Sequence, residues 1–394
     1  YLIQYSVDSG TTWLGISHTA SPVPSRLVAS LTNGVAYLFR IMAVNSEGIG
    51  SVSAAVTAIP FVVHTPNDPA TFSACPTGVI PVAGFTDITS TDVDCIAYYG
   101  ITKGTTTTTY SPSAPVTRWQ MALFLTRIAG LAGVTLGNGV DQGFIDISGK
   151  SAEIQTAINQ IRQLGVTVGK TATTFAPDDD VIREEMALFI SRFLEKAVAG
   201  PGGNTELGSG SGLYQVIKSN DSDHNFTDLG QSYLWETHVA IINLWNLGVT
   251  DVQTGTLYEP AVDMTRKAMA TFMANALAHS NARPAGLVLQ ASGYRVPNGT
   301  SVTMSVTHRT ADLDPIVGSY VDTFLHHHTT VTTATRFDTN GHCTVYIFVT
   351  TLSSTKCSVD TADPKTDADG NLATCSEVPP IFNFADVWAW TTAP

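Results

Sequence analysis

Charged residues are scarce in this chain. Asp, Glu, Lys and Arg make up 13% of its 394 residues, against about 25% in typical soluble domains. The formal net charge is −13, whereas a nucleic-acid-binding surface needs clustered Lys and Arg to replace phosphate counterions. The composition therefore argues against a nucleic-acid partner. It favours a surface of uncharged polar residues, as expected for a protein outside the cell that packs against neighbours.

Long apolar runs are also lacking. No stretch approaches the 18 or more apolar residues of a membrane span, so we expect no membrane-spanning helix. The sequence has no initiator Met and no signal peptide, and it opens inside a strand-like run, Tyr1-Leu2-Ile3-Gln4-Tyr5. We therefore expect a mature or truncated form of a secreted protein.

Cysteine is rare, and none of the five cysteines belongs to a C-x-x-C pair, which argues against zinc. Their positions predict two local disulfides, Cys75–Cys95 and Cys357–Cys375, with Cys343 left over. Two disulfides imply an oxidising, extracellular compartment.

Catalytic motifs are missing as well. Gly149-Lys150-Ser151 lacks the first glycine of a P-loop, and Gly208–Gly212 has glycine where a nucleophile elbow needs serine. His326-His327-His328 is a poor metal site, because adjacent strand residues point to opposite faces. We predict no enzyme activity and no cofactor except possible calcium. The weak calcium candidates are Asp178, Asp180, Asp367 and Asp369, but the complete EF-hand spacing is absent and solvated turns explain these residues better.

A repeat fills the middle of the chain. Gly100, Gly165 and Gly248 each follow a helical pattern, as glycines that end helices do. At constant spacings after each glycine come an aromatic residue, a proline, an arginine, a methionine and a phenylalanine. The three sets are Tyr110, Pro112, Arg118, Met121 and Phe124; Phe175, Pro177, Arg183, Met186 and Phe189; and Tyr258, Pro260, Arg266, Met269 and Phe272.

Each copy is predicted to fold as helix, loop, helix. In the second helix apolar residues recur with helical period, as in Met121, Phe124, Leu125 and Ile128. Each copy also opens with Phe-x-Asp, at Asp87, Asp146 and Asp228. Because one copy cannot bury its apolar stripe alone, we expect the copies to pack together.

This combination of motifs resembles the S-layer homology (SLH) family of bacterial surface proteins. The segment Val116–Leu125 is similar to the variant common in actinobacteria. The resemblance places repeats at 80–135, 140–199 and 223–282, with a Gly/Ser-rich linker or loop at 200–222. Two positions depart from the motif, with Ile182 in place of Thr and Ala268 in place of an acid or amide.

The resemblance implies that the three arginines line grooves between repeats and bind an acidic, often pyruvylated cell-wall polysaccharide. Thr117 and Gln120 form a capping box that places Arg118 in the first turn of its helix. A cation there costs about 0.3–1 kcal/mol against the helix dipole. An anion that meets the free N–H groups of the helix start reverses this cost.

The predicted glycan-contacting set has a structural alternative. Each arginine could instead pair with a Phe-x-Asp carboxylate and only join repeats, and Trp119 could be a packing residue instead of a platform for a sugar ring. The predicted set is Arg118, Arg183, Arg266, Trp119, Asp87, Asp146 and Asp228.

The flanking segments are predicted to be β-rich. Residues 1–61 resemble part of a fibronectin type III domain, in which Tyr37 would be the tyrosine-corner residue. Residues 285–394 are loosely similar to bacterial immunoglobulin-like domains. The fold class is therefore multidomain α+β: a partial β-sandwich, a three-repeat helical bundle and a C-terminal β-sandwich.

We expect an extracellular structural protein of the bacterial cell surface that anchors to a wall polysaccharide and associates with itself into a surface layer or filament. Two alternatives stay open. One is a wall-anchored enzyme whose catalytic domain lies upstream, and the other is an adhesin that binds through its C-terminal domain.

Overall fold

The computed structural model describes residues 1–17, 26, 28–32, 35–60, 66–206, 226–229, 235–252, 256–293, 300–327, 363–377 and 385–391. The chain divides into two compact units, Tyr1–His64 and Thr65–Pro394. Mixed helices and antiparallel sheets confirm the α+β class.

The first unit is an antiparallel sheet. Its strands are β1 (Leu2–Ser6), β2 (Leu14–Ile16), β3 (Tyr37–Asn45), β4 (Gly48–Val52) and β5 (Val56–Ala58). They are ordered β2-β1-β3-β4, and β5 also pairs with β3. The buried Tyr37 accepts a hydrogen bond from the Thr32 N–H at 3.0 Å, the type of contact that a tyrosine corner makes. Membership of the fibronectin type III family stays a prediction.

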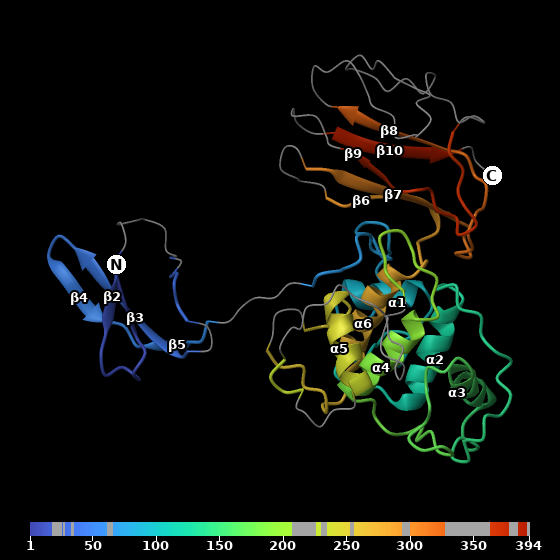
Figure 1. Ribbon diagram of the computed structural model, residues 1–394, viewed down its shortest axis with the longest axis horizontal. Coiled ribbons are helices and arrows are strands. Elements are labelled where there is room, and N and C mark those ends of the chain that lie inside the picture. Colours follow the sequence, from blue (N-terminus) through green and yellow to red (C-terminus); the bar gives the residue numbers. More distant parts are fainter. Residues whose placement is uncertain are drawn as a thin grey trace. The chain divides into compact units, whose positions relative to one another are not determined.

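The second unit contains six described helices, two from each repeat (Figure 1). The first helices of the repeats are α1 (Thr91–Tyr98), α3 (Ala152–Gln163) and α5 (Trp235–Asn246). The second helices are α2 (Arg118–Ala129), α4 (Arg183–Leu194) and α6 (Arg266–His279). None of the described helices has the length and apolar character of a membrane span.

The repeats close into a ring. Helix α3 packs on α2, α5 packs on α4, and α1 packs on α6, so each first helix meets the second helix of another repeat. We call these contacts junction 1 (α2/α3), junction 2 (α4/α5) and junction 3 (α6/α1).

At the centre of the ring three fully buried residues form a cycle of backbone hydrogen bonds. Val116 N donates to Met264 O (2.9 Å), Met264 N to Val181 O (2.7 Å), and Val181 N to Val116 O (2.8 Å). The pattern explains why an apolar residue precedes the Thr/Ile-Arg pair in all three copies.

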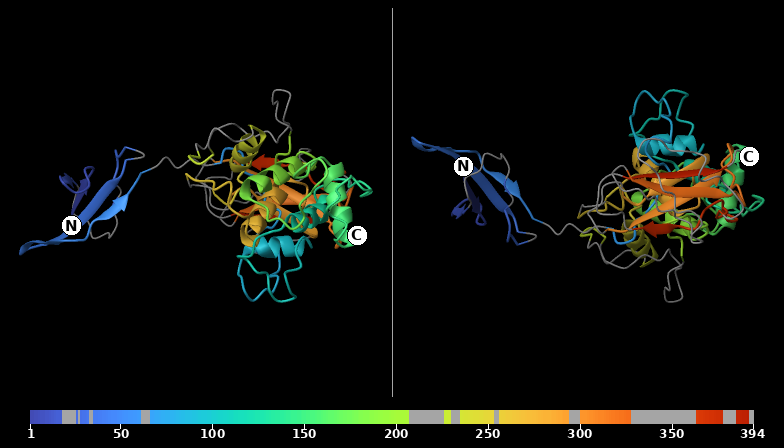
Figure 2. Two further views of the ribbon diagram at one scale, coloured as in Figure 1. Left: turned by 90° about the horizontal axis from the view of Figure 1, so that it is seen from below. Right: turned by 90° about the horizontal axis from the view of Figure 1, so that it is seen from above.

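The C-terminal strands belong to the same compact unit as the helices (Figures 1 and 2). One antiparallel sheet contains β6 (Gly286–Ala291), β7 (Val302–Arg309) and β9 (Cys375–Glu377), and another pairs β8 (Val321–His327) with β10 (Ala385–Thr391). Side chains connect the strands to the helical part, since Gln290 exchanges two hydrogen bonds with the Ser73 backbone. The immunoglobulin-like assignment stays a prediction.

The Cys75–Cys95 disulfide is present, as predicted, with a Cα–Cα distance of 5.7 Å. It joins α1 to the segment of residues 66–80, which we call the strap. Cys343, Cys357 and most of the predicted linker lie outside the described residues, so the second disulfide stays a prediction.

Candidate functional site

The Phe-x-Asp carboxylates hold the aromatic-x-Pro loops. Asp87 accepts the N–H groups of Tyr110 (2.8 Å) and Ser111 (2.7 Å), and the first of these bonds lowers the pKa of Asp87. The other two carboxylates act in the same way on Phe175, Ala176, Tyr258 and Glu259. The residue after each aromatic has a positive φ: 58° at Ser111, 56° at Ala176 and 57° at Glu259. The two hydrogen bonds that each carboxylate accepts from backbone N–H groups support this uncommon backbone conformation.

The three arginines reach the same loops from the other side. Each buried guanidinium donates through Nε to the carbonyl of the aromatic residue of another repeat and lies over its ring. The bonds are Arg118 to Phe175 O (2.8 Å), Arg183 to Tyr258 O (2.7 Å) and Arg266 to Tyr110 O (2.7 Å). The alternative of a direct Arg–Asp pair in Phe-x-Asp is therefore wrong, because the two groups hold opposite sides of one loop.

The acidic partners of the arginines differ between junctions. Arg118 forms an ion pair with Glu185 at 3.1 Å. Arg183 makes a bidentate contact with Asp251 at 2.8 and 2.7 Å, which outweighs burial and raises the pKa of Arg183. Within the described residues no carboxylate forms an ion pair with Arg266. Burial lowers the pKa of Arg266.

The N–H groups at the helix starts are not free, which corrects the sequence prediction. Arg118 N donates to Asp179 O (2.9 Å) and Trp119 N to Pro177 O (3.0 Å). The corresponding groups of α4 and α6 donate to loop carbonyls in the same way. An anion at a helix start would therefore have to rely on side chains. Of the predicted capping box, Gln120 accepts from Thr117 N at 3.2 Å.

The remaining candidates are dispersed. Trp119 is half-buried and packs against the helical core. Asp178 pairs with Lys150, and Asp367 accepts from the N–H groups of Asp369 and Asn371. No group of three or more His, Cys, Asp or Glu side chains that could hold a metal ion occurs in the described part of the chain. The side chains of His326 and His327, and the whole of His328, lie outside that part.

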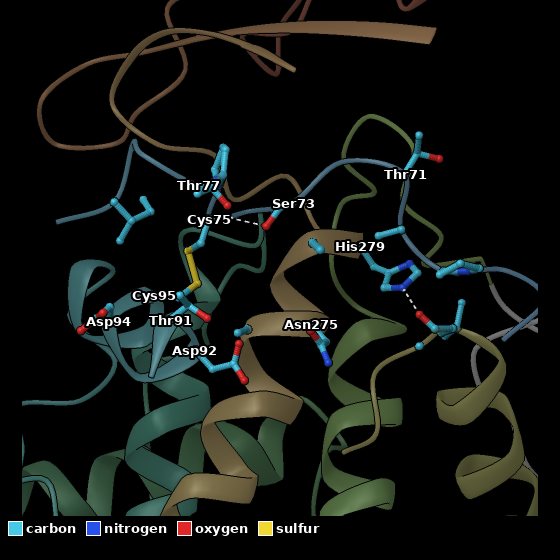
Figure 3. A pocket seen from close by; sticks show the side chains of 18 of the residues that line it. Thr71, Ser73, Cys75, Thr77, Thr91, Asp92, Asp94, Cys95, Asn275 and His279 are labelled. Carbon is cyan, nitrogen blue, oxygen red and sulfur yellow. Dashed lines mark hydrogen bonds between the residues drawn. A yellow bond between two sulfur atoms is a disulfide. The ribbon is translucent and has the colours of Figure 1, made fainter. Parts of the chain in front are cut away.

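One cavity was not predicted from the sequence. It has a volume of about 490 Å³ and lies at junction 3, where the strap crosses α1 and α6. Figure 3 shows the Cys75–Cys95 disulfide beside it, with Asp92 from α1 and Asn275 from α6.

The comparisons with known proteins address the repeats. The family model of the S-layer homology domain matches residues 85–122 and 143–187. The chain therefore contains SLH domains. The matched segments contain Asp87, Arg118, Asp146 and Arg183. In the third repeat Asp228, Tyr258 and Arg266 show the same loop and arginine geometry.

One relative is an endoglucanase of Bacillus sp. (strain KSM-635). It is 33% identical over 117 residues, which are 29% of this chain and 12% of the endoglucanase. The similarity therefore concerns a small part of that enzyme.

Proposed function

We propose that this SLH protein is an extracellular structural protein of the cell surface, and that its ring of repeats binds an acidic cell-wall polysaccharide. The observation that supports this most is the recurrence of one arrangement at three junctions: an arginine, an aromatic loop and a Phe-x-Asp carboxylate. An anchor with three related sites suits a polymer of repeating sugars, because several weak contacts to one chain add to a firm attachment.

Junction 3 is the strongest candidate for the acidic group of the polysaccharide. Arg183 forms an ion pair with Asp251, and Arg118 shares the carboxylate of Glu185 with Lys170. Arg266 is buried, and its further polar contact is a long one of 3.4 Å to Thr102 Oγ1. The charge of Asp87 attracts Arg266 without a direct ion pair, and a buried cation that lacks a direct partner costs several kcal/mol. A carboxylate on the ligand would recover part of this cost by a charge-assisted contact with the guanidinium.

The test compares Arg266→Met with Arg127→Met in the full chain. Met keeps most of the side-chain volume and removes the charge, and Arg127 is a partly exposed arginine paired with Glu153. Binding to purified wall polysaccharide should weaken at least about tenfold for Arg266→Met, which corresponds to about 1.4 kcal/mol. The Arg127 variant should bind as the unaltered protein does.

A second variant and a second ligand make the result decisive. Arg266→Lys keeps the charge and should retain part of the binding, while circular dichroism reports on the fold of every variant. Polysaccharide stripped of its acidic groups should bind poorly. Equal binding of the stripped polymer, or unchanged binding by a folded Arg266→Met protein, would overturn the role of Arg266.

A second candidate function has one specific observation in its favour, the similarity to an endoglucanase. In that case the repeats would attach an enzyme to the wall. The mass of the native protein from cells, together with an assay of the native form on cellulose derivatives, distinguishes the two proposals.

A further inference from the structure

Junctions 1 and 2 share a set of contacts that junction 3, where the cavity lies, does not have. At junctions 1 and 2 an arginine from the second helix donates to a backbone carbonyl of its own repeat and forms an ion pair with a glutamate on the adjoining first helix. The contacts are Arg127 to Ile101 O (3.2 Å) and Glu153 (3.1 Å), and Arg192 to Val166 O (3.3 Å) and Glu236 (2.7 Å).

At junction 3 both halves of this ion pair are replaced. The position of the arginine is taken by Asn275, whose amide donates to the equivalent carbonyl, Val249 O, at 3.3 Å. The amide is shorter than a guanidinium and carries no charge. Helix α1 has 8 residues whereas α3 and α5 have 12, so the first turn that carries the glutamate at the other junctions is absent. The cavity lies beside these changes.

Two carboxylates line the cavity without a cation. Asp92 accepts from Thr271 Oγ1 at 2.6 Å, and Asp94 accepts from Ala83 N at 2.8 Å. Each contact engages one oxygen, which leaves the second oxygen of each carboxylate without a donor among the residues that the structure describes. Neither aspartate forms an ion pair with any Lys, Arg or His that the structure describes.

A purely structural role explains only part of this arrangement. Aspartates in the first turn favour a helix by about 0.3–1 kcal/mol through the helix dipole. That effect accounts for acidic residues at the start of α1. It does not account for the loss of the arginine or for a cavity of about 490 Å³ next to them.

We propose that this cavity binds a small organic cation, a ligand that carries a primary ammonium group among hydroxyls. Its charge would take the place that the guanidinium of Arg127 or Arg192 has at the other junctions. The carboxylate of Asp92 would accept from the ammonium group. Asp94 lies two residues further along α1 and faces another side of the helix, so it would contribute through its negative charge at the cavity lining. The threonines of the lining, Thr71, Thr77 and Thr91, offer partners for hydroxyls. The site uses different residues from the arginine of the polysaccharide site, so the two proposals can fail separately.

The experiment is a calorimetric titration of the full, oxidised chain with glucosamine. Glucose is the neutral control of similar shape, and Nα-acetyl-lysine amide presents the same ammonium group on a peptide side chain. Glucosamine should bind at least about tenfold more tightly than glucose. Tighter binding of the lysine derivative would assign the cation to a peptide and not to an amino sugar.

Two variants test the site itself. Asn275→Arg restores the residue of the other junctions and should abolish binding by filling the cavity. Asp92→Asn with Asp94→Asn should weaken binding about tenfold or more, while the exposed Asp312→Asn should leave it unchanged.

The proposal is wrong if glucose and glucosamine bind equally, or if neither ammonium ligand binds at millimolar concentration. It is equally wrong if the folded double aspartate variant binds as the unaltered chain does. Circular dichroism checks the fold of each variant, and the aspartate pair decides the question if Asn275→Arg does not fold.

Discussion

A single histidine at the end of α6 depends on its neutral form. His279 is buried, its Nδ1 accepts from Asn204 N at 3.0 Å, and its Nε2 lies 2.7 Å from Leu247 O. The proton is therefore assigned to Nε2, because Nδ1 faces an N–H group. Burial lowers the pKa of His279, while the contact with Leu247 and the charge of Asp68 oppose the shift. A second proton would point at the Asn204 N–H group.

This geometry predicts a loss of stability in mild acid. The folded-state pKa lies below the unfolded value of about 6.5, so the unfolded chain binds more protons as the pH falls. The contribution of His279 is therefore complete above about pH 6.5 and declines below it, by about 1.4 kcal/mol for each unit of pKa lowering. Urea unfolding between pH 7.5 and 5 should show a steeper fall for the unaltered chain than for His279→Gln. The half-buried His238, changed to Gln, is the control; identical slopes for the His279 variant and the unaltered chain would contradict the prediction.

At the scale of elements, local patterns predicted the second helices well. Helices α2, α4 and α6 begin at Arg118, Arg183 and Arg266, because the apolar period and the residues at the helix start lie within one segment. The partners of those arginines could not be predicted in this way. Arg118 contacts the carbonyl of Phe175, a residue 57 positions along the chain, and only closure of the ring brings the two together.

The cavity was missed although the sequence contains a signal for it. The same register that aligned the conserved positions of the three repeats also aligns Arg127, Arg192 and Asn275. The exchange of arginine for asparagine was visible there. Its consequence was not, because the shorter α1 and the position of the strap depend on tertiary contacts such as Thr71 N to Gly202 O (2.9 Å).

The strap provides a prediction at the element scale. Its disulfide closes a sequence separation of 20 residues, which stabilises the folded chain by roughly 3 kcal/mol in the chain-entropy account. Cys75→Ser with Cys95→Ser should lower the free energy of unfolding by about this amount, as measured in urea. Reductant should destabilise the unaltered chain by more than it destabilises the double variant. Only the unaltered chain has the Cys75–Cys95 disulfide to lose, whereas any other disulfide is common to both proteins. Equal effects of reductant on the two proteins would show that the strap disulfide contributes nothing.

At the scale of the whole molecule, the two units differ in how far they bury their apolar residues. The ring of repeats buries its apolar stripes internally, because α1 packs on α6 and leaves no terminal repeat. The sheet of the first unit has an apolar face that remains accessible. Strand pairing places Ile3, Tyr5, Phe39 and Ile41 on that face, opposite Arg40 and Gln4. Ile41 is 46% exposed and Val56, which pairs with Phe39, is 66% exposed.

The proposed assembly into a surface layer or filament therefore predicts self-association through this face. The whole chain carries a net charge of −13, but in the first unit Asp8 and Glu47 are balanced by Arg26 and Arg40. Little net charge therefore opposes contact at this face, and buried apolar surface contributes about 25 cal/mol per Å². Ile41→Lys with Val56→Lys should shift the protein toward monomer in analytical ultracentrifugation at micromolar concentration. The matched control is Leu2→Lys with Val52→Lys, because both residues pair with Met42 on the opposite face and are partly exposed. A chain that is monomeric at every concentration, or an equal effect of both double variants, would exclude this face as the contact and leave the anchoring role of the repeats unaffected.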